Sequence, residues 1–154
     1  MSRPIGRLPL AAKIRLAAKI WLDYAHVRVG LRRSGLPRFV QRLQETPRDQ
    51  DVVALEPRRL SRAVHRTLRI GPIRPRCLTS SLVLLKLLKR QDTEADLVIG
   101  LPHAGDGVIA HAWVEVDGVV VGPPPGSVGQ RELVRYGQST STGTRGSRPG
   151  PGPR

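Results

Sequence analysis

Two residues of this chain have side chains that together could carry out nucleophilic and acid–base chemistry: Cys77, its only cysteine, and His111. Cys77 lies in the run PRCLTSSLVLLKLLKR, residues 75–90. Proline is tolerated only in the first turn of a helix, so this run predicts a helix that begins between Pro75 and Leu78. The thiol would then lie at the helix N-terminus, where unpaired N–H groups and the positive end of the helix dipole favour the thiolate form. A lone cysteine beside a leucine-rich run can equally be a small buried hydrophobe.

His111 lies in the run VIAHAWVEV, which predicts a β-strand. A strand is a rigid support for an imidazole that must keep a fixed distance from a sulfur atom. Such an imidazole takes the thiol proton, the thiolate attacks a carbonyl carbon, and the imidazolium then protonates the leaving amine. Backbone N–H groups near Cys77 would bind the oxyanion. The alternative is a structural histidine in a hairpin.

The first third of the chain predicts a long amphipathic helix over residues 9–33. Its apolar residues recur at spacings of three and four and are, in order, Leu10, Ile14, Ala17, Trp21, Tyr24 or Ala25, and Val29. We expect this face to pack on the domain core, because Trp21 and the leucines otherwise have nothing to cover. A basic amphipathic helix that lies on a membrane or on a partner is the alternative.

Two further helices are predicted, a short one over residues 38–44 and a longer one over residues 55–70 with Pro57 in its first turn. His65 lies in the middle of the longer helix among arginines, which favours a surface or packing role over a ligand role. These helices and the helix of Cys77 account for the α part of the fold.

Short β-branched and apolar runs predict a small antiparallel sheet. Its expected strands are residues 96–101, 109–116 and 119–122, the last two joined around Asp117-Gly118. The expected fold class is α+β, with N-terminal helices, a central helix that carries the cysteine, and this sheet. The composition divides the chain into an N-terminal helical region (1–50), a core (51–136) and a tail (137–154) whose lack of aliphatic and aromatic residues after Tyr136 predicts disorder.

Charge and composition restrict the function classes. The chain has 154 residues, a formal net charge of +14 and a pI of about 11.6, which raises the possibility of a basic nucleic-acid-binding protein. Its arginines are scattered, it has only two Trp, two Tyr and one Phe, and it shows no zinc-finger spacing, so we expect no specific nucleic-acid partner. One cysteine and four dispersed histidines predict no metal site, and we expect no cofactor. The lone thiol and the absence of a signal or transmembrane segment predict a cytoplasmic protein.

The run RCLTSSLVLLKLLKRQDTEADLVIGL, followed by AHAWVEVDG, resembles the leader peptidase of lasso peptide biosynthesis, the microcin-processing B-type family, over about residues 55–125. This resemblance implies a transglutaminase-like, papain-like cysteine protease fold. It implies that Cys77 is the nucleophile and His111 the general base, acting on the bond between leader and core of a ribosomally made lasso precursor. It also implies three partners: the precursor's leader peptide, a separate leader-recognition protein, and a lasso cyclase that uses the released amine.

The chain departs from the family at the third catalytic position. The family has an acid about twelve positions after the histidine, on the return strand; with a three-residue hairpin loop, His111 would lie opposite Pro123, which is no acid. Asp117 lies at the hairpin tip, and Glu115 is ~13 Å from His111 along the strand. Asp106, in the preceding loop, is a possible orienting acid. The sequence therefore leaves open a working Cys–His dyad, a relocated acid, or a weakened or inactive enzyme that serves as a binding or scaffold subunit of the same maturation complex.

Two other residues are candidates for lining the site. Ser81 lies one turn after Cys77 and either bonds within the helix or lines the cleft. Trp113 alternates onto the same strand face as His111 and either walls the site or packs in the core.

Overall fold

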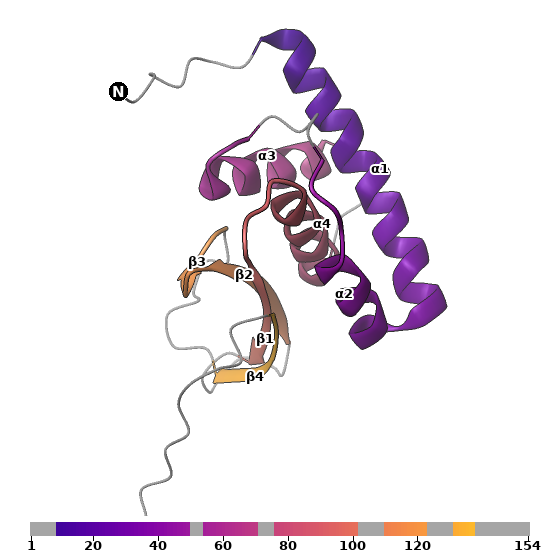
Figure 1. The fold of residues 1–154 in the computed structure, drawn as a ribbon, viewed down its shortest axis with the longest axis vertical. Helices are drawn as coiled ribbons and strands as arrows, with labels where there is room; N and C mark the ends of the chain where they lie inside the picture. The colour runs from indigo at the N-terminus through magenta and orange to yellow at the C-terminus, as the bar shows by residue number, and fades with distance from the viewer. Residues whose placement is uncertain (1–8, 50–53, 71–75, 102–109, 123–130, 138–154) are drawn as a thin grey trace, which may run out of the picture.

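The computed structural model describes residues 9–49, 54–70, 76–101, 110–122 and 131–137 (Figure 1). Asp106, Pro123 and the predicted tail beyond Gly137 lie outside the described residues. The helices are α1 (Leu10–Ser34), α2 (Leu36–Gln44), α3 (Pro57–Arg69) and α4 (Cys77–Arg90), and the strands are β1 (Asp96–Leu101), β2 (His111–Val116), β3 (Val119–Val120) and β4 (Arg131–Tyr136). This α+β arrangement confirms the predicted fold class.

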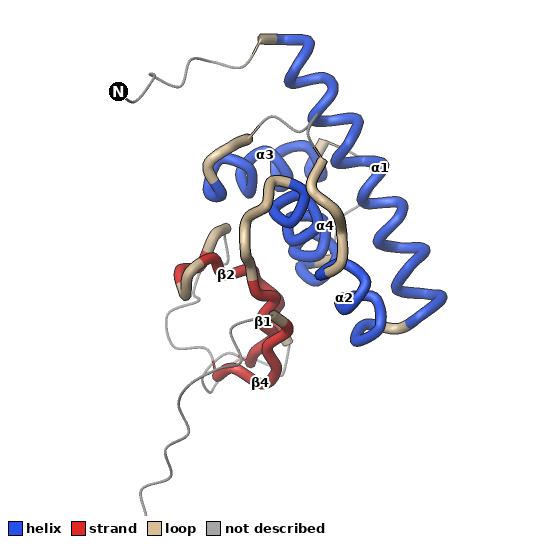
Figure 2. The backbone as a smooth tube through the Cα atoms, in the orientation of Figure 1, coloured by secondary structure: helices blue, strands red, loops and turns tan. Residues whose placement is uncertain are grey.

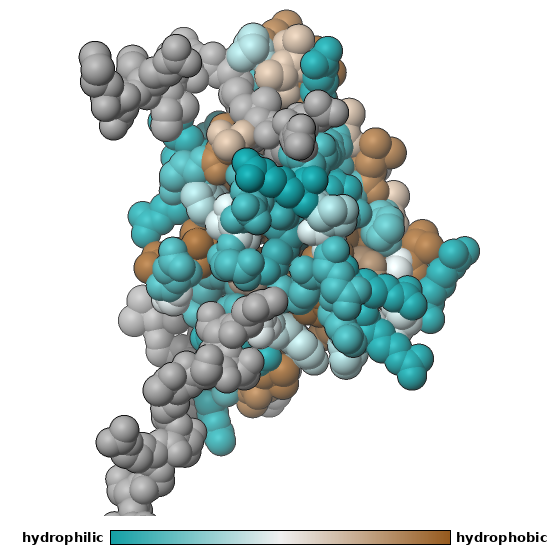
Figure 3. Space-filling view, viewed as in Figure 1, coloured by the Kyte–Doolittle hydropathy of each residue, from teal (hydrophilic) through white to brown (hydrophobic). Residues whose placement is uncertain are grey.

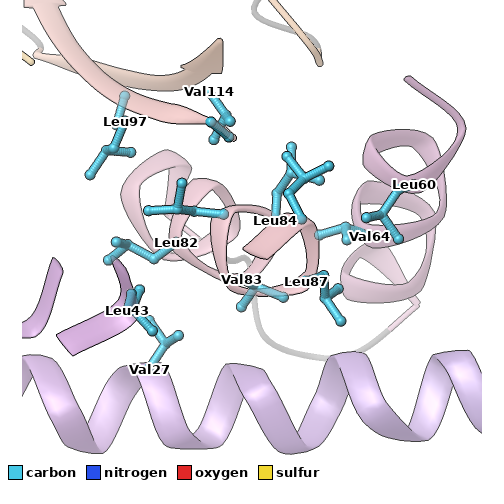
Figure 4. Close-up of a cluster of buried hydrophobic side chains, with 14 of the residues drawn as sticks. Val27, Leu43, Leu60, Val64, Leu82, Val83, Leu84, Leu87, Leu97 and Val114 are labelled. Atoms are coloured by element: carbon cyan, nitrogen blue, oxygen red, sulfur yellow. The ribbon is translucent and has the colours of Figure 1, made fainter. Parts of the chain in front are cut away.

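Helix α4 is the centre of the molecule, as its leucine-rich sequence predicts. Every residue from Thr79 to Lys89 is buried. Helices α1 and α2 pack on one side of α4, the sheet lies on the opposite side, and α3 lies beside α4 (Figures 1 and 2). Figure 4 shows the side chains that fill the space between these layers, with Leu82 and Leu84 of α4 between Leu97 of β1 and Val64 of α3. Full burial of each leucine contributes about 1.5–3 kcal/mol, so α4 is a fixed base for the cysteine at its first residue.

Helix α1 forms where it was predicted, but the predicted apolar face is only partly right: Tyr24 is buried and Trp21 packs against the core, whereas three other members of that face are exposed. Leu10, Ile14 and Val29 are 73%, 61% and 48% exposed, and Figure 3 shows hydrophobic residues on the outer side of the molecule along α1. The packed face instead carries Asp23, which is 3% exposed. A carboxylate lies there because cations of α4 pair with it, at 2.8 Å from Lys86 Nζ and 2.6 Å from Arg90.

The other residues that α1 buries are Ile20, Tyr24 and Val27. No helix in the described part of the chain is long and apolar enough to span a membrane.

Within the described part of the chain the sheet has four strands in the order β3-β2-β1-β4, one more than the sequence predicts. Strand β4 pairs antiparallel with β1, with an irregularity between Ile99 and Gly100. Its side chains are mostly exposed, so it lacks the apolar alternation that reveals a strand. Arg135 fixes β4 through ion pairs that include Asp96 at 3.1 Å and Glu115 at 2.9 Å.

The hairpin between β2 and β3 forms at Asp117-Gly118, as predicted, but with a two-residue loop. Both loop residues have positive φ, 51° and 74°, which is the type I′ geometry that matches the twist of paired strands. Val116 therefore pairs with Val119, and Glu115 pairs with Val120. The three-residue loop, and with it the register that placed Pro123 opposite His111, is wrong.

Candidate functional site

Cys77 is the first residue of α4, and its side chain is partly buried. Arg76 precedes it in extended conformation and makes no side-chain capping hydrogen bond to the helix. The first backbone bond into the helix runs from Ser80 N–H to the Arg76 carbonyl, at 3.1 Å. The backbone N–H groups of Cys77, Leu78 and Thr79 therefore have no partner inside the helix. They point out of the helix N-terminus, the end at which Cys77 lies. This is the N-terminal environment that the sequence predicts.

His111 is the first residue of β2, and it shares a small cavity with Cys77. The cavity has a volume of about 20 Å³. It is lined by His65, Cys77, Ser81, Leu84, His111, Ala112, Trp113, Val114, Val121 and Gly122. The fold thus brings the predicted nucleophile and the predicted base to one cavity from elements 34 positions apart in the sequence.

Ser81 links the helix that carries Cys77 to the strand that carries His111. Its side chain is buried, and Oγ donates a hydrogen bond of 2.9 Å to the Ala112 carbonyl, the residue after His111. The bond joins α4 to β2 one helical turn from Cys77. Ser81 lines the cavity, as one alternative predicted, but it bonds across to the strand and not within its own helix.

Trp113 stacks beside the imidazole of His111, with ring centroids 6.4 Å apart and an interplanar angle of 17°. Its ring also covers Gly100, where an added Cβ would come within 2.7 Å of a ring carbon. The indole N–H donates to Glu115 at 2.8 Å. Trp113 is buried, but it lies on the sheet face opposite to Ala112, which packs in the core with α4. Trp113 therefore packs beside the histidine ring, at one side of the site, and is not part of the central core.

Glu115 does not orient His111. Besides the indole bond, its carboxylate pairs with Arg135, whose pKa is raised by hydrogen bonds to Glu132, Glu115 and Asp96. Burial lowers the pKa of His111, and its Nε2 atom is buried without a hydrogen-bond partner among the described residues.

His65 is the site residue that the sequence prediction missed. It is half-buried on α3 and lines the same cavity as Cys77 and His111. Its pKa is lowered by burial first, then by Arg69 and His111. The sequence does contain one sign of this role: His65 directly follows Val64, which belongs to the buried stripe of α3. A histidine that borders such a stripe faces a neighbouring element.

A thiol at a helix N-terminus and an imidazole on an adjacent antiparallel strand, within an α+β fold, is the arrangement of cysteine-dependent acyl-transfer enzymes. Residues 21–134, most of the chain, match the family model described as the transglutaminase-like superfamily, and the chain belongs to that superfamily. The superfamily includes cysteine proteases and transferases. No curated protein and no solved structure matches the chain. Among the described residues, no group of three or more His, Cys, Asp or Glu side chains is arranged to hold a metal ion.

Proposed function

We propose that this chain is a cysteine endopeptidase that removes the leader peptide from a ribosomally made lasso precursor. The observation that carries the proposal is the single cavity that Cys77 and His111 share. The Cys77 thiolate attacks the carbonyl carbon of the bond between leader and core, and the C–N bond breaks as imidazolium protonates the amine. Water then attacks the thioester, which releases the leader's carboxylate and restores the thiol.

The backbone at the start of α4 supports this role. The N–H groups of Cys77 and Leu78 have no partner within the helix, so they are free to donate to an oxyanion formed at the carbon that Cys77 attacks. The hydrogen bond from Ser81 to β2 holds this end of the helix against the strand of His111. Attack and oxyanion binding would then occur on one rigid frame, without a conformational change that must first assemble it.

A second cavity, of about 460 Å³, offers a place for the leader peptide. It lies between α1 and the first turn of α4, and it is lined by Tyr24, Arg28, Leu31, Arg32, Arg76, Leu78 and Thr79. Three of these residues are arginines and none is acidic, which favours carboxylates of an acidic leader segment. Two of them, Arg76 and Leu78, flank Cys77 in the chain, so a peptide bound there would run past the nucleophile.

The proposal includes partners. A separate leader-recognition protein presents the precursor, and a lasso cyclase consumes the amine that cleavage releases. A reducing compartment such as the cytoplasm suits the free thiol of Cys77.

The test is cleavage of the precursor, in the presence of the recognition protein, followed by mass spectrometry. We expect wild type to release the leader, and Cys77→Ala and His111→Ala to release none. His26→Ala is the matched control, because this histidine is exposed on α1 and does not line the cavity.

A second function, that of a binding or scaffold subunit, is favoured by the unpartnered Nε2 of His111. A wild-type chain that binds the precursor but cleaves it no faster than Cys77→Ala would establish this second function. Leader release that persists in Cys77→Ala would contradict the assignment of the nucleophile.

A further inference from the structure

Two buried polar side-chain atoms in this part of the molecule have no hydrogen-bond partner among the described residues: Nε2 of His111, which lines the cavity, and Oγ of Ser61 on α3. Ser61 is 0% exposed. A Cβ added at Gly122 would stand 2.6 Å from Ser61 Oγ and 3.8 Å from His65 Nε2. These two polar groups of α3 therefore lie side by side against the end of the hairpin, and the missing side chain at Gly122 allows α3 to bring His65 to the cavity.

The chemistry of a Cys–His pair requires an acceptor at this place. An imidazolium carries N–H groups on both ring nitrogens, so while one faces the sulfur the other needs a hydrogen-bond acceptor. In a complete triad a carboxylate has this role. Here Glu115 is held by Trp113 and Arg135, on the sheet. The Ser81 hydroxyl donates to β2. Neither its oxygen nor that of Ser61 accepts a hydrogen bond from His111 Nε2, which has no partner among the described residues.

Among the described residues that line the cavity, His65 carries the remaining side chain with a lone pair to offer, since the indole of Trp113 can only donate. The cavity's volume of about 20 Å³ is enough for one water molecule, which needs about 10–15 Å³. We propose that His65 is a positioning residue for His111: its neutral imidazole accepts the Nε2–H hydrogen bond of His111 through one buried water and fixes the ring toward Cys77. This inference rests on the proposed function of the Cys77 and His111 pair.

The electrostatics favour His65 as the acceptor. Burial, Arg69 and His111 all lower the pKa of His65, so it stays neutral near pH 7 and keeps a lone pair to offer. The titratable side chains that line the cavity with His111 are Cys77 on α4 and His65 on α3, and Arg69 of α3 lies close enough to act on His65. On the sheet, the charged side chains nearest this site, Asp96, Glu115, Glu132 and Arg135, are paired with one another. Since the sheet residues satisfy one another, the α3 side is where His111 meets an uncharged acceptor.

The test compares His65→Leu with His65→Gln, because glutamine keeps a hydrogen-bond acceptor and leucine does not. The first readout is the pKa of His111, which NMR measures by titrating the imidazole protons of the four histidines of wild type and the three that remain in each variant. We expect His65→Leu to lower the pKa of His111, because the charged form loses its acceptor, and His65→Gln to restore it. Circular dichroism melting shows whether both variants fold.

The second readout is alkylation of Cys77 by iodoacetamide at pH 6.5, which needs no peptide substrate. We expect His65→Leu to slow alkylation roughly tenfold or more, and His65→Gln to stay near wild type. The positioning role is overturned if folded His65→Leu has the same His111 pKa and the same alkylation rate as wild type. Equal alkylation in wild type and His111→Ala would instead refute the proposed base, while the NMR comparison still decides the role of His65.

Discussion

Substitution of Gly122 by alanine tests how closely α3 packs against the end of the hairpin. Gly122 has a φ of 137°, a conformation that is strained for any residue with a Cβ and costs about 1–3 kcal/mol. The added methyl group would also stand 2.6 Å from the hydroxyl of Ser61, which is fully buried and has little room to move. Overpacking of this kind costs about 1–3 kcal/mol. We expect Gly122→Ala to lower the free energy of unfolding by about 2–5 kcal/mol in total.

Urea denaturation measures this loss, and two variants divide it into its parts. Gly118→Ala is the backbone control, because Gly118 also has a positive φ, 74°, but an added Cβ there meets nothing within 4 Å. Gly122→Ala combined with Ser61→Ala removes the clashing oxygen and keeps the backbone strain. We expect the double variant to recover the part of the unfolding free energy that the clash with Ser61 removes. We expect Gly118→Ala to lower the free energy of unfolding by only about 1–2 kcal/mol.

Close packing of α3 on the hairpin is refuted if Gly122→Ala lowers the free energy of unfolding no more than Gly118→Ala does, or if removal of the Ser61 hydroxyl recovers none of the loss. Either result would mean that α3 does not approach the hairpin as closely as the structure places it. The support for His65 as a cavity residue would then weaken as well, since His65 depends on the same contact.

Three more results are expected. Asp23→Ala should lower the free energy of unfolding by about 3–5 kcal/mol, because the substitution leaves Lys86 buried without its counter-charge. Thermal melting measures this loss, and the double variant Asp23→Ala with Lys86→Met should recover most of it. Ser81→Ala should cost about 0.5–1.5 kcal/mol in urea denaturation and slow leader cleavage, and an unchanged cleavage rate would argue against its bond to β2 as a support for the site. Stability should fall as the pH drops through 6.5: burial lowers the pKa of His65 and His111 in the folded chain, so the unfolded chain binds more protons there, and a melting temperature that stays flat between pH 7.5 and pH 5 would contradict this.

Much of the fold follows from local patterns. Proline position and the leucine-rich run locate the start of α4 and hence Cys77 at its first turn. The Asp117-Gly118 pair locates the hairpin that carries His111. These signals depend on a few neighbouring residues, so a single sequence contains them.

Other features depend on partners far away in the chain. Asp23 lies on the buried face of α1 only because Lys86 and Arg90 pair with it, and hydropathy assigns a carboxylate to the surface. His65 enters the site because Gly122, 57 positions later, leaves room for α3. Neither pairing is visible before the elements are placed in space.

Strand β4 has a consequence for the solubility of the chain. The apolar strand β1 would be an open sheet edge without it, with unpaired backbone groups along DLVIGL that could template pairing with other chains. β4 covers that edge and places Arg131, Glu132 and Arg135 on the new rim. Charged side chains on an edge strand discourage further strand addition, so β4 protects the protein from edge-to-edge aggregation while it contributes no residue to the cavity of Cys77.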